Sequence, residues 1–198
     1  AGSPNAVAAL NALDSGHSYT NVVNPSDLTG VVGSLAGSGV VQSAAGNDII
    51  NGGAGKDIIY GDVMNTDVLR AAAGLSAATY PAGSGWAVSA ALEGTTTAFT
   101  TANDPGGDGA QWTRADTLAY IASHQRELAT ESGRTGGDDT ITGGTGDDII
   151  FAQEGNDKIN YAQGDGKDTV DGGTGSDTLY ITGATGTVTI AAATGGTD

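Results

Sequence analysis

One short pattern recurs along the chain and constrains its fold more than any other feature: glycine, any residue, aspartate, any residue, aliphatic residue. Its aspartates are Asp48, Asp57, Asp139, Asp148, Asp157, Asp168 and Asp177. Within each block they stand nine residues apart, except for an interval of eleven before Asp168. The aliphatic positions are all filled, by Ile50, Ile59, Ile141, Ile150, Ile159, Val170 and Leu179. A fixed short period indicates a solenoid in which each repeat is one structural unit.

The two blocks of repeats join at a broken nonapeptide. Gly61 and Asp62 fill its first two positions, and its other seven positions return as Gly136 to Thr142. We therefore interpret residues 1–198 as one split domain, in which 43–62 and 136–180 form a roll and 63–135 is an insertion. Two separate small rolls are the alternative.

The composition limits the function classes. The chain has 23 acidic and 7 basic residues, a net charge of −16, and 34 glycines. Such a charge repels nucleic acid and anionic membrane and opposes folding unless something neutralises it. The chain has no cysteine, so neither disulfides nor thiolate metal sites can supply that stability. Bound metal is the usual substitute.

Catalytic and targeting signals are absent from the sequence. Its two histidines, His17 and His124, are isolated, and no H-E-x-x-H or G-x-S-x-G motif occurs. We expect no enzyme activity and no catalytic residues. No apolar run is long enough for membrane insertion, and the start AGSPNAVAALNALD lacks a charged leader. We expect any secretion to be directed from outside this segment.

Helical patterns occur outside the repeats. The insertion predicts short helices at Thr66–Ala73 and Gly85–Leu92 and a longer one after Thr113, which has Asp116 three residues on as a capping box. One face of that helix is predicted to hold Leu118, Ile121, Ala122, Gln125 and Leu128. Residues 1–42 predict an N-terminal helical cap with helices at Asn5–Leu13 and Ser26–Leu35. Residues 181–198 predict a terminal strand and tail.

The repeats match the G-G-x-G-x-D-x-U-x nonapeptide of the RTX family, which this chain resembles over about a third of its length. The resemblance implies an α+β, mostly β fold: a calcium-bound parallel β-roll, interrupted here by a helical insertion. Calcium takes six to eight oxygen ligands, and an ion fits between a turn and the turn two repeats later. The implied pairs are Asp48 with Asp139, Asp57 with Asp148, Asp139 with Asp157, Asp148 with Asp168, and Asp157 with Asp177. We expect about five Ca²⁺ ions, held by the seven aspartates, and name Asp62 as a further metal ligand.

The interrupted form resembles segments of giant adhesins that Gram-negative bacteria secrete through type I systems. It implies an extracellular or cell-surface location and a monomeric module of a larger chain. In such adhesins split rolls either assist export or bind the free C-terminus of a polypeptide on a host or neighbouring cell. Because about 115 residues lie outside the repeats, we favour peptide binding over a passive export scaffold. Tyr60, Asp62, Trp112 and Tyr120, in or beside the insertion, are the predicted ligand-binding residues.

Overall fold

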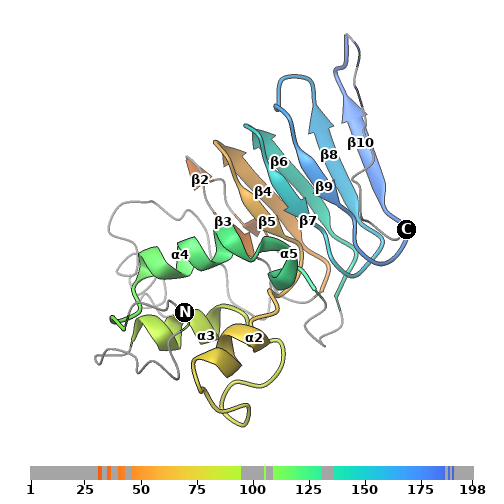
Figure 1. The fold of residues 1–198 in the computed structure, drawn as a ribbon. Coiled ribbons are helices and arrows are strands. Elements are labelled where there is room, and N and C mark those ends of the chain that lie inside the picture. The colour runs from red at the N-terminus through yellow and green to blue at the C-terminus, as the bar shows by residue number, and fades with distance from the viewer. Residues whose placement is uncertain are drawn as a thin grey trace, which may run out of the picture.

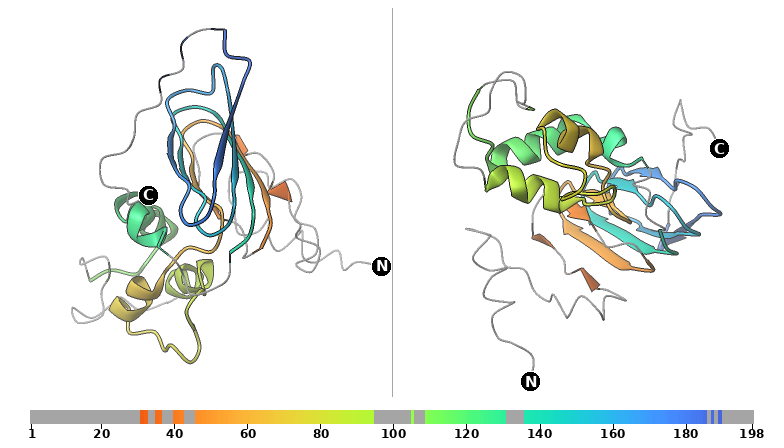
Figure 2. Two further views of the ribbon diagram at one scale, coloured as in Figure 1. Left: turned by 90° about the vertical axis from the view of Figure 1, so that its right-hand side faces the viewer. Right: turned by 90° about the horizontal axis from the view of Figure 1, so that it is seen from below.

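The structure, a computed structural model, describes residues 31–32, 35–36, 40–42, 46–94, 105, 109–130, 136–185, 187 and 189. Its strands form two parallel sheets (Figures 1 and 2). The first sheet has the order β1 (Val31–Val32), β4 (Ile49–Ala54), β6 (Thr140–Thr145), β8 (Lys158–Ala162) and β10 (Thr178–Thr182), and β2 (Leu35–Ala36) also pairs with β4. The second has the order β3 (Val40–Gln42), β5 (Ile58–Tyr60), β7 (Ile149–Phe151) and β9 (Thr169–Asp171). The predicted parallel β-roll is therefore confirmed.

Strand register continues across the insertion. β4 pairs with β6 so that Ile50 lies opposite Ile141, and β6 pairs with β8 so that Ile141 lies opposite Ile159. In the second sheet Ile59 lies opposite Ile150. The repeats before residue 63 and those after residue 135 are thus adjacent rungs of the same two sheets.

The two sheets share one hydrophobic core. It consists of the aliphatic residue of each central repeat with one alanine: Ile50, Ile59, Ile141, Ile150, Ile159 and Ala152. Val170 packs against this core, whereas Leu179 on the last strand is 39% exposed. The aliphatic position points inward because residues two apart along a strand share a face. The core thins toward β10, since β10 has a paired neighbour on one side only.

The prediction of a helix over Ser26–Leu35 is wrong where the structure describes that range. β1 and β2 occupy Val31–Val32 and Leu35–Ala36 and pair with β4. The helical spacing of apolar residues there competes with the strand preference of the valine pair, and the exposed edge of β4 selects the strand. The predicted helix Asn5–Leu13 lies outside the described residues.

The insertion contains the predicted short helices. α2 spans Asp67–Ala72 after Thr66, and α3 spans Trp86–Glu93 after Gly85. α4 spans Arg114–Ser123, and the predicted capping box is confirmed: the Thr113 hydroxyl accepts from the Asp116 N–H, and the Thr113 N–H donates to Asp116 Oδ2. None of the described helices is long and apolar enough to cross a membrane.

The longer helix differs from its prediction in two respects. It is interrupted at His124, after which α5 spans Gln125–Leu128. The Ser123 hydroxyl donates to the carbonyls of Ala119 and Tyr120 and so competes with the backbone hydrogen bonds of the helix. The predicted face is confirmed at Ile121 and Leu128, which are buried, but it extends toward Thr117 rather than toward Leu118 and Ala122. Thr117 is buried, where its hydroxyl accepts from Trp112 Nε1 and donates to Glu93. Leu118 and Ala122 are exposed.

The insertion covers the outer face of β5 and β7 in the second sheet (Figure 1). The outward-pointing Tyr60 and Phe151 stack with ring centroids 5.5 Å apart. Met64, Ile121 and Leu128 of the insertion complete a buried cluster over these rings. A further small core lies within the insertion and consists of Leu69, Ala73, Val88, Leu92 and Trp112. The roll and the insertion are therefore joined by a continuous apolar contact.

Neighbouring isoleucines offer a matched test of this architecture. Ile50 is 1% exposed in the shared core, whereas Ile49 is 54% exposed on the outside of the same strand. We expect Ile50→Ala to lower the free energy of unfolding by about 2–5 kcal/mol, the usual cost of such a cavity. Ile49→Ala should cost about 1 kcal/mol or less. Chemical unfolding in calcium measures both, and equal losses would contradict the inward placement of Ile50.

Candidate calcium-binding turns

Each nonapeptide begins with a glycine-rich turn that ends on its aspartate. Turns before strands of the first sheet hold Asp48, Asp139, Asp157 and Asp177, which we call the first column. Turns before strands of the second sheet hold Asp57, Asp148 and Asp168, the second column. The turns stack without space for side chains: Gly146 has φ +145°, and a Cβ there would overlap the carbonyl of Gly55.

Hydrogen bonds link the aspartates along each column. In every step a backbone N–H donates to Oδ1 of the aspartate in the next turn. The donor–acceptor distances are 2.8 Å for Asp48 to Asp139, 2.9 Å for Asp57 to Asp148, 2.8 Å for Asp139 to Asp157, 3.1 Å for Asp148 to Asp168, and 3.0 Å for Asp157 to Asp177. The structure thus brings together all five pairs expected from the repeat spacing.

The second carboxylate oxygen has a different environment. Oδ2 of Asp139, Asp148 and Asp157 is buried and has no hydrogen-bond partner in the described parts of the chain. In Asp148 this atom faces the first glycine of its own turn, since a Cβ on Gly143 would lie 2.5 Å from it. The same relation joins Gly61 and Asp139 across the insertion. A buried charged oxygen without a partner is costly, so these atoms require a cation or a proton.

The pKa values show the same requirement. Burial raises the pKa of Asp139 to about 8 and that of Asp157 to about 6. Backbone N–H donors oppose these shifts, and neighbouring carboxylates reinforce them. Burial also raises the pKa of Asp148 and Asp168. Carboxyls whose ionisation is opposed by burial and by neighbouring carboxylates are suited to a divalent cation.

Calcium fits this donor set. In the described residues no three acidic or histidine side chains stand together at metal-ligand spacing. A site here must therefore combine paired aspartates with backbone carbonyls, and calcium accepts both kinds of oxygen in a flexible shell. The seven predicted aspartates lie in the turns, although enclosure falls along the roll: Asp168 is half-buried and Asp177 is exposed.

The eleven-residue repeat keeps the aspartate in register. Its two additional residues lie between Ala162 and Gly166, in a loop closed by the Ala162 N–H donating to Asp165 Oδ2 at 2.6 Å. Gly166 then stacks on the Gly146 carbonyl as the equivalent glycines do in other turns. The step from Asp148 to Asp168 is the longest of the five, at 3.1 Å.

The four predicted ligand-binding residues do not surround one cavity. Tyr60 and Trp112 are buried in two separate hydrophobic clusters. Tyr120 is half-buried, stacked on His124 with centroids 3.9 Å apart and tilted against Trp112. Asp62 lies in the first column of turns. One sequence signal could have indicated that Tyr60 and Phe151 are covered. β5 and β7 each carry a second pair of apolar residues on the face opposite the core, Ile58 with Tyr60 and Ile149 with Phe151, and such pairs mark a second buried face.

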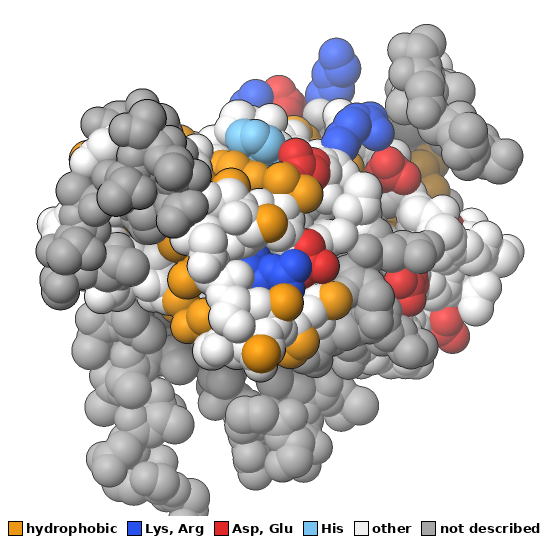
Figure 3. All heavy atoms as spheres, turned by 60° about the horizontal axis from the view of Figure 1, so that its bottom comes forward, with side chains coloured by type: hydrophobic (Ala, Val, Ile, Leu, Met, Phe, Trp, Pro, Cys, Tyr) orange, Lys and Arg blue, Asp and Glu red, His pale blue; other side chains and the backbone are white. Residues whose placement is uncertain are grey.

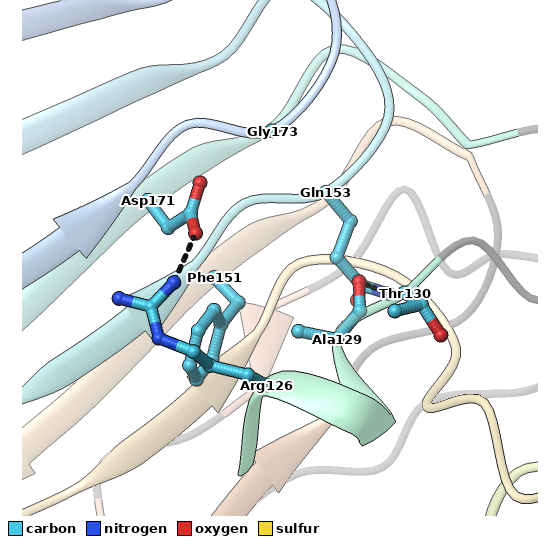
Figure 4. Close-up of a pocket in the computed structure, with 7 residues that line it drawn as sticks. All are labelled: Arg126, Ala129, Thr130, Phe151, Gln153, Asp171 and Gly173. Atoms are coloured by element: carbon cyan, nitrogen blue, oxygen red, sulfur yellow. Dashed lines mark hydrogen bonds and ion pairs between the residues drawn. The ribbon is translucent and has the colours of Figure 1, made fainter. Parts of the chain in front are cut away.

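A pocket of about 170 Å³ lies where α5 meets the roll (Figure 4). Its lining residues are Arg126, Ala129, Thr130, Phe151, Gln153, Asp171 and Gly173. Arg126 and Asp171 form an ion pair of 3.4 Å at one side. Opposite, the Gln153 amide donates to the carbonyls of Val63 and Ala129 at 3.4 Å each. Arg126, Phe151 and Gln153, three residues lining this pocket, were not among the predicted site residues.

Without divalent ions, stability should depend on pH in a defined direction. The native pKa values of Asp139, Asp148, Asp157 and Asp168 exceed the ordinary value of about 3.9. Between about pH 4 and pH 8 the native state therefore binds more protons than the unfolded chain, and stability falls as the pH rises. Urea unfolding in chelator should show a midpoint that decreases across this window. A midpoint that increases would contradict the burial of these carboxyls.

Comparison with known proteins matches the repeats to one family. The RTX calcium-binding nonapeptide repeat (4 copies) matches residues 35–63, 135–167 and 162–180, which leaves the insertion outside. No curated protein and no solved structure matched the chain. Such repeats are typical of extracellular bacterial proteins secreted by type I systems. The paired aspartates, the stacked glycine turns and this match agree: the chain carries RTX calcium-binding nonapeptide repeats.

Proposed function

We propose that this domain is a calcium-dependent adhesion module of a type I-secreted bacterial adhesin, and that it binds the free C-terminus of a peptide rather than acting as an enzyme. The observation that carries the proposal is the position of the pocket. It lies between the insertion and the calcium-binding turns, and two of its lining residues, Gln153 and Gly173, belong to turns of the first column. A ligand there contacts both parts of the domain.

The pocket suits the end of a peptide chain. Phe151 and Ala129 supply apolar contact, and Arg126 supplies a positive charge that is 64% exposed. Basic, acidic and hydrophobic side chains are also interspersed on the insertion side of the surface (Figure 3). Because the whole chain is strongly acidic, a ligand carboxylate needs a local cation to overcome the general repulsion.

Calcium supplies the second cation when it is bound. Gly173 lies in the turn that carries Asp177, the exposed end of the first column. An ion between Asp157 and Asp177 is therefore the least enclosed of the first column and the nearest to the pocket. A shell left open on that side accepts one more oxygen ligand, and we propose that the peptide carboxylate provides it.

Calcium should stabilise the fold strongly. The five aspartate pairs imply about five ions, and each ion that binds only the native state adds RT ln(1 + [L]/Kd) to stability. Thermal melts in calcium and in chelator should differ by roughly 20 °C or more, as expected for several kcal/mol. Magnesium should substitute poorly, since it demands tighter octahedral geometry. Superimposable melts would contradict calcium-dependent folding.

Peptide binding has a matched pair of variants. Calorimetry on a peptide library should show binding that disappears when the peptide C-terminus is amidated and when calcium is chelated. Arg126→Ala should weaken binding by about tenfold, the effect of about 1.4 kcal/mol. Arg114→Ala is the control, because Arg114 is similarly exposed and also forms one ion pair, with Glu93, but lies outside the pocket.

Other outcomes separate the alternatives. Equal affinity for amidated peptides would exclude the carboxylate mechanism. If no peptide binds the calcium-loaded domain, while a fused passenger is exported faster, the export scaffold is the better interpretation.

A further inference from the structure

Asp62 differs from every residue at the equivalent position of the described repeats. The second position of the other turns holds Gly53, Gly144, Gln153, Ala162 and Gly173, none of which is charged. Asp62 is the last residue of the roll before the insertion, and it is only 5% exposed. A carboxylate has therefore been placed inside the turn column at the point where the chain leaves it.

The Asp62 carboxylate is poorly satisfied by the protein. Its Oδ1 is buried and has no hydrogen-bond partner in the described residues. Its Oδ2 accepts one long hydrogen bond of 3.3 Å from the Glu154 N–H. No described lysine or arginine pairs with it. Burial raises the pKa of Asp62 to about 7, although backbone N–H groups of Glu154 and Gly46 lower it.

Other acidic residues lie near Asp62. The turn continues at Gly136, whose Cα faces Asp62 Oδ2 and whose N–H donates to the Glu154 carboxylate at 2.9 Å. Asp139 closes the same turn, and its Oδ2, also without a partner among the described residues, faces Gly61 next to Asp62. Like charges from Asp139 and Asp157 act on this group. Two buried carboxylate oxygens of one turn, Asp62 Oδ1 and Asp139 Oδ2, thus lack a partner among the described residues and need a compensating charge.

We propose that Asp62 is an additional ligand of the calcium ion bound in the turn of Asp139, and that this ion holds both ends of the insertion on the roll. The inference rests on calcium binding by the repeats but not on peptide binding. Asp62 and Asp139 would share the ion with backbone carbonyls, the mixed set that calcium accepts. Because these two ligands flank residues 63–135, the ion closes a long loop. Its removal leaves the apolar cluster around Tyr60 and Phe151 to hold the insertion on the roll.

The protein carries its own reporter for this coupling. Both tryptophans of the chain, Trp86 and Trp112, lie in the insertion. Trp86 packs against the cluster that joins the insertion to the roll, and Trp112 lies in the insertion core. Tryptophan emission therefore follows the insertion, while the β signal in far-ultraviolet circular dichroism follows the roll.

The experiment is a calcium titration of the chelated protein followed by both signals. In Asp62→Asn the tryptophan transition should move to calcium concentrations roughly tenfold higher, the size expected for a lost ligand. The β signal should move much less. Asp138→Asn is the control, because it removes the same charge from the same turn at an exposed position. A tryptophan transition of Asp62→Asn that coincides with that of the control would overturn the proposal.

A second variant is needed in case the first one does not fold. If Asp62→Asn does not fold even in saturating calcium, Asp62→Glu restores a carboxylate at the same position. Recovery of folding and of the tryptophan transition by Asp62→Glu supports ligation, and failure of both variants overturns it. Asp148→Asn, in the second column, separates the role of Asp62 from calcium binding by the repeats in general. If Asp148→Asn lowers calcium affinity while Asp62→Asn does not, calcium binding stands and the role of Asp62 falls.

Discussion

The burial of carboxylates in stacked turns is the constraint on which the rest of the structure depends. Five of the seven aspartates use Oδ1 to accept a hydrogen bond from the backbone of the preceding turn in their column. This hydrogen bond sets the spacing of the coils and, at the same time, carries the charge into the interior. The small aliphatic core of the roll cannot offset several buried like charges. The fold and its metal are therefore parts of one energetic unit, and the −16 charge of the chain becomes compatible with a compact state.

Most of the roll could be predicted from the sequence because its rules are local. A period of nine residues fixes which residue turns, which residue points inward and which turns become neighbours, as the five aspartate pairs show. The capping box at Thr113 was predictable for the same reason, since three residues define it. β1 and β2 were not, because the strand conformation at Val31 and Leu35 depends on pairing with β4 rather than on nearby residues.

The placement of the predicted ligand-binding residues depends on longer-range contacts than that of the metal turns. Tyr60 and Trp112 were predicted because they lie in or beside the insertion, and both are buried. The burial of Tyr60 depends on which face of the roll the insertion packs against, and Tyr60 stacks there on Phe151 from a different coil. Trp112 is covered by the insertion's own core. The buried face of α4 extends toward Thr117, whose burial depends on the distant Glu93. Such long-range contacts leave no short periodic signal.

Both departures from the nine-residue period enter the repeat at the same place, after its second residue. One is the three-residue loop between Ala162 and Gly166, and the other is the whole segment from residue 63 to residue 135. In each case the chain returns in time to supply the glycine at the fourth position and the aspartate, so the strands on either side keep their partners. This point of the turn is thus a socket, a place that accepts extra chain of very different length, because the turn is also hydrogen-bonded to neighbouring coils on both sides of it. A solenoid with such sockets can gain a new binding surface without altering its scaffold, and each coil offers another place to do so.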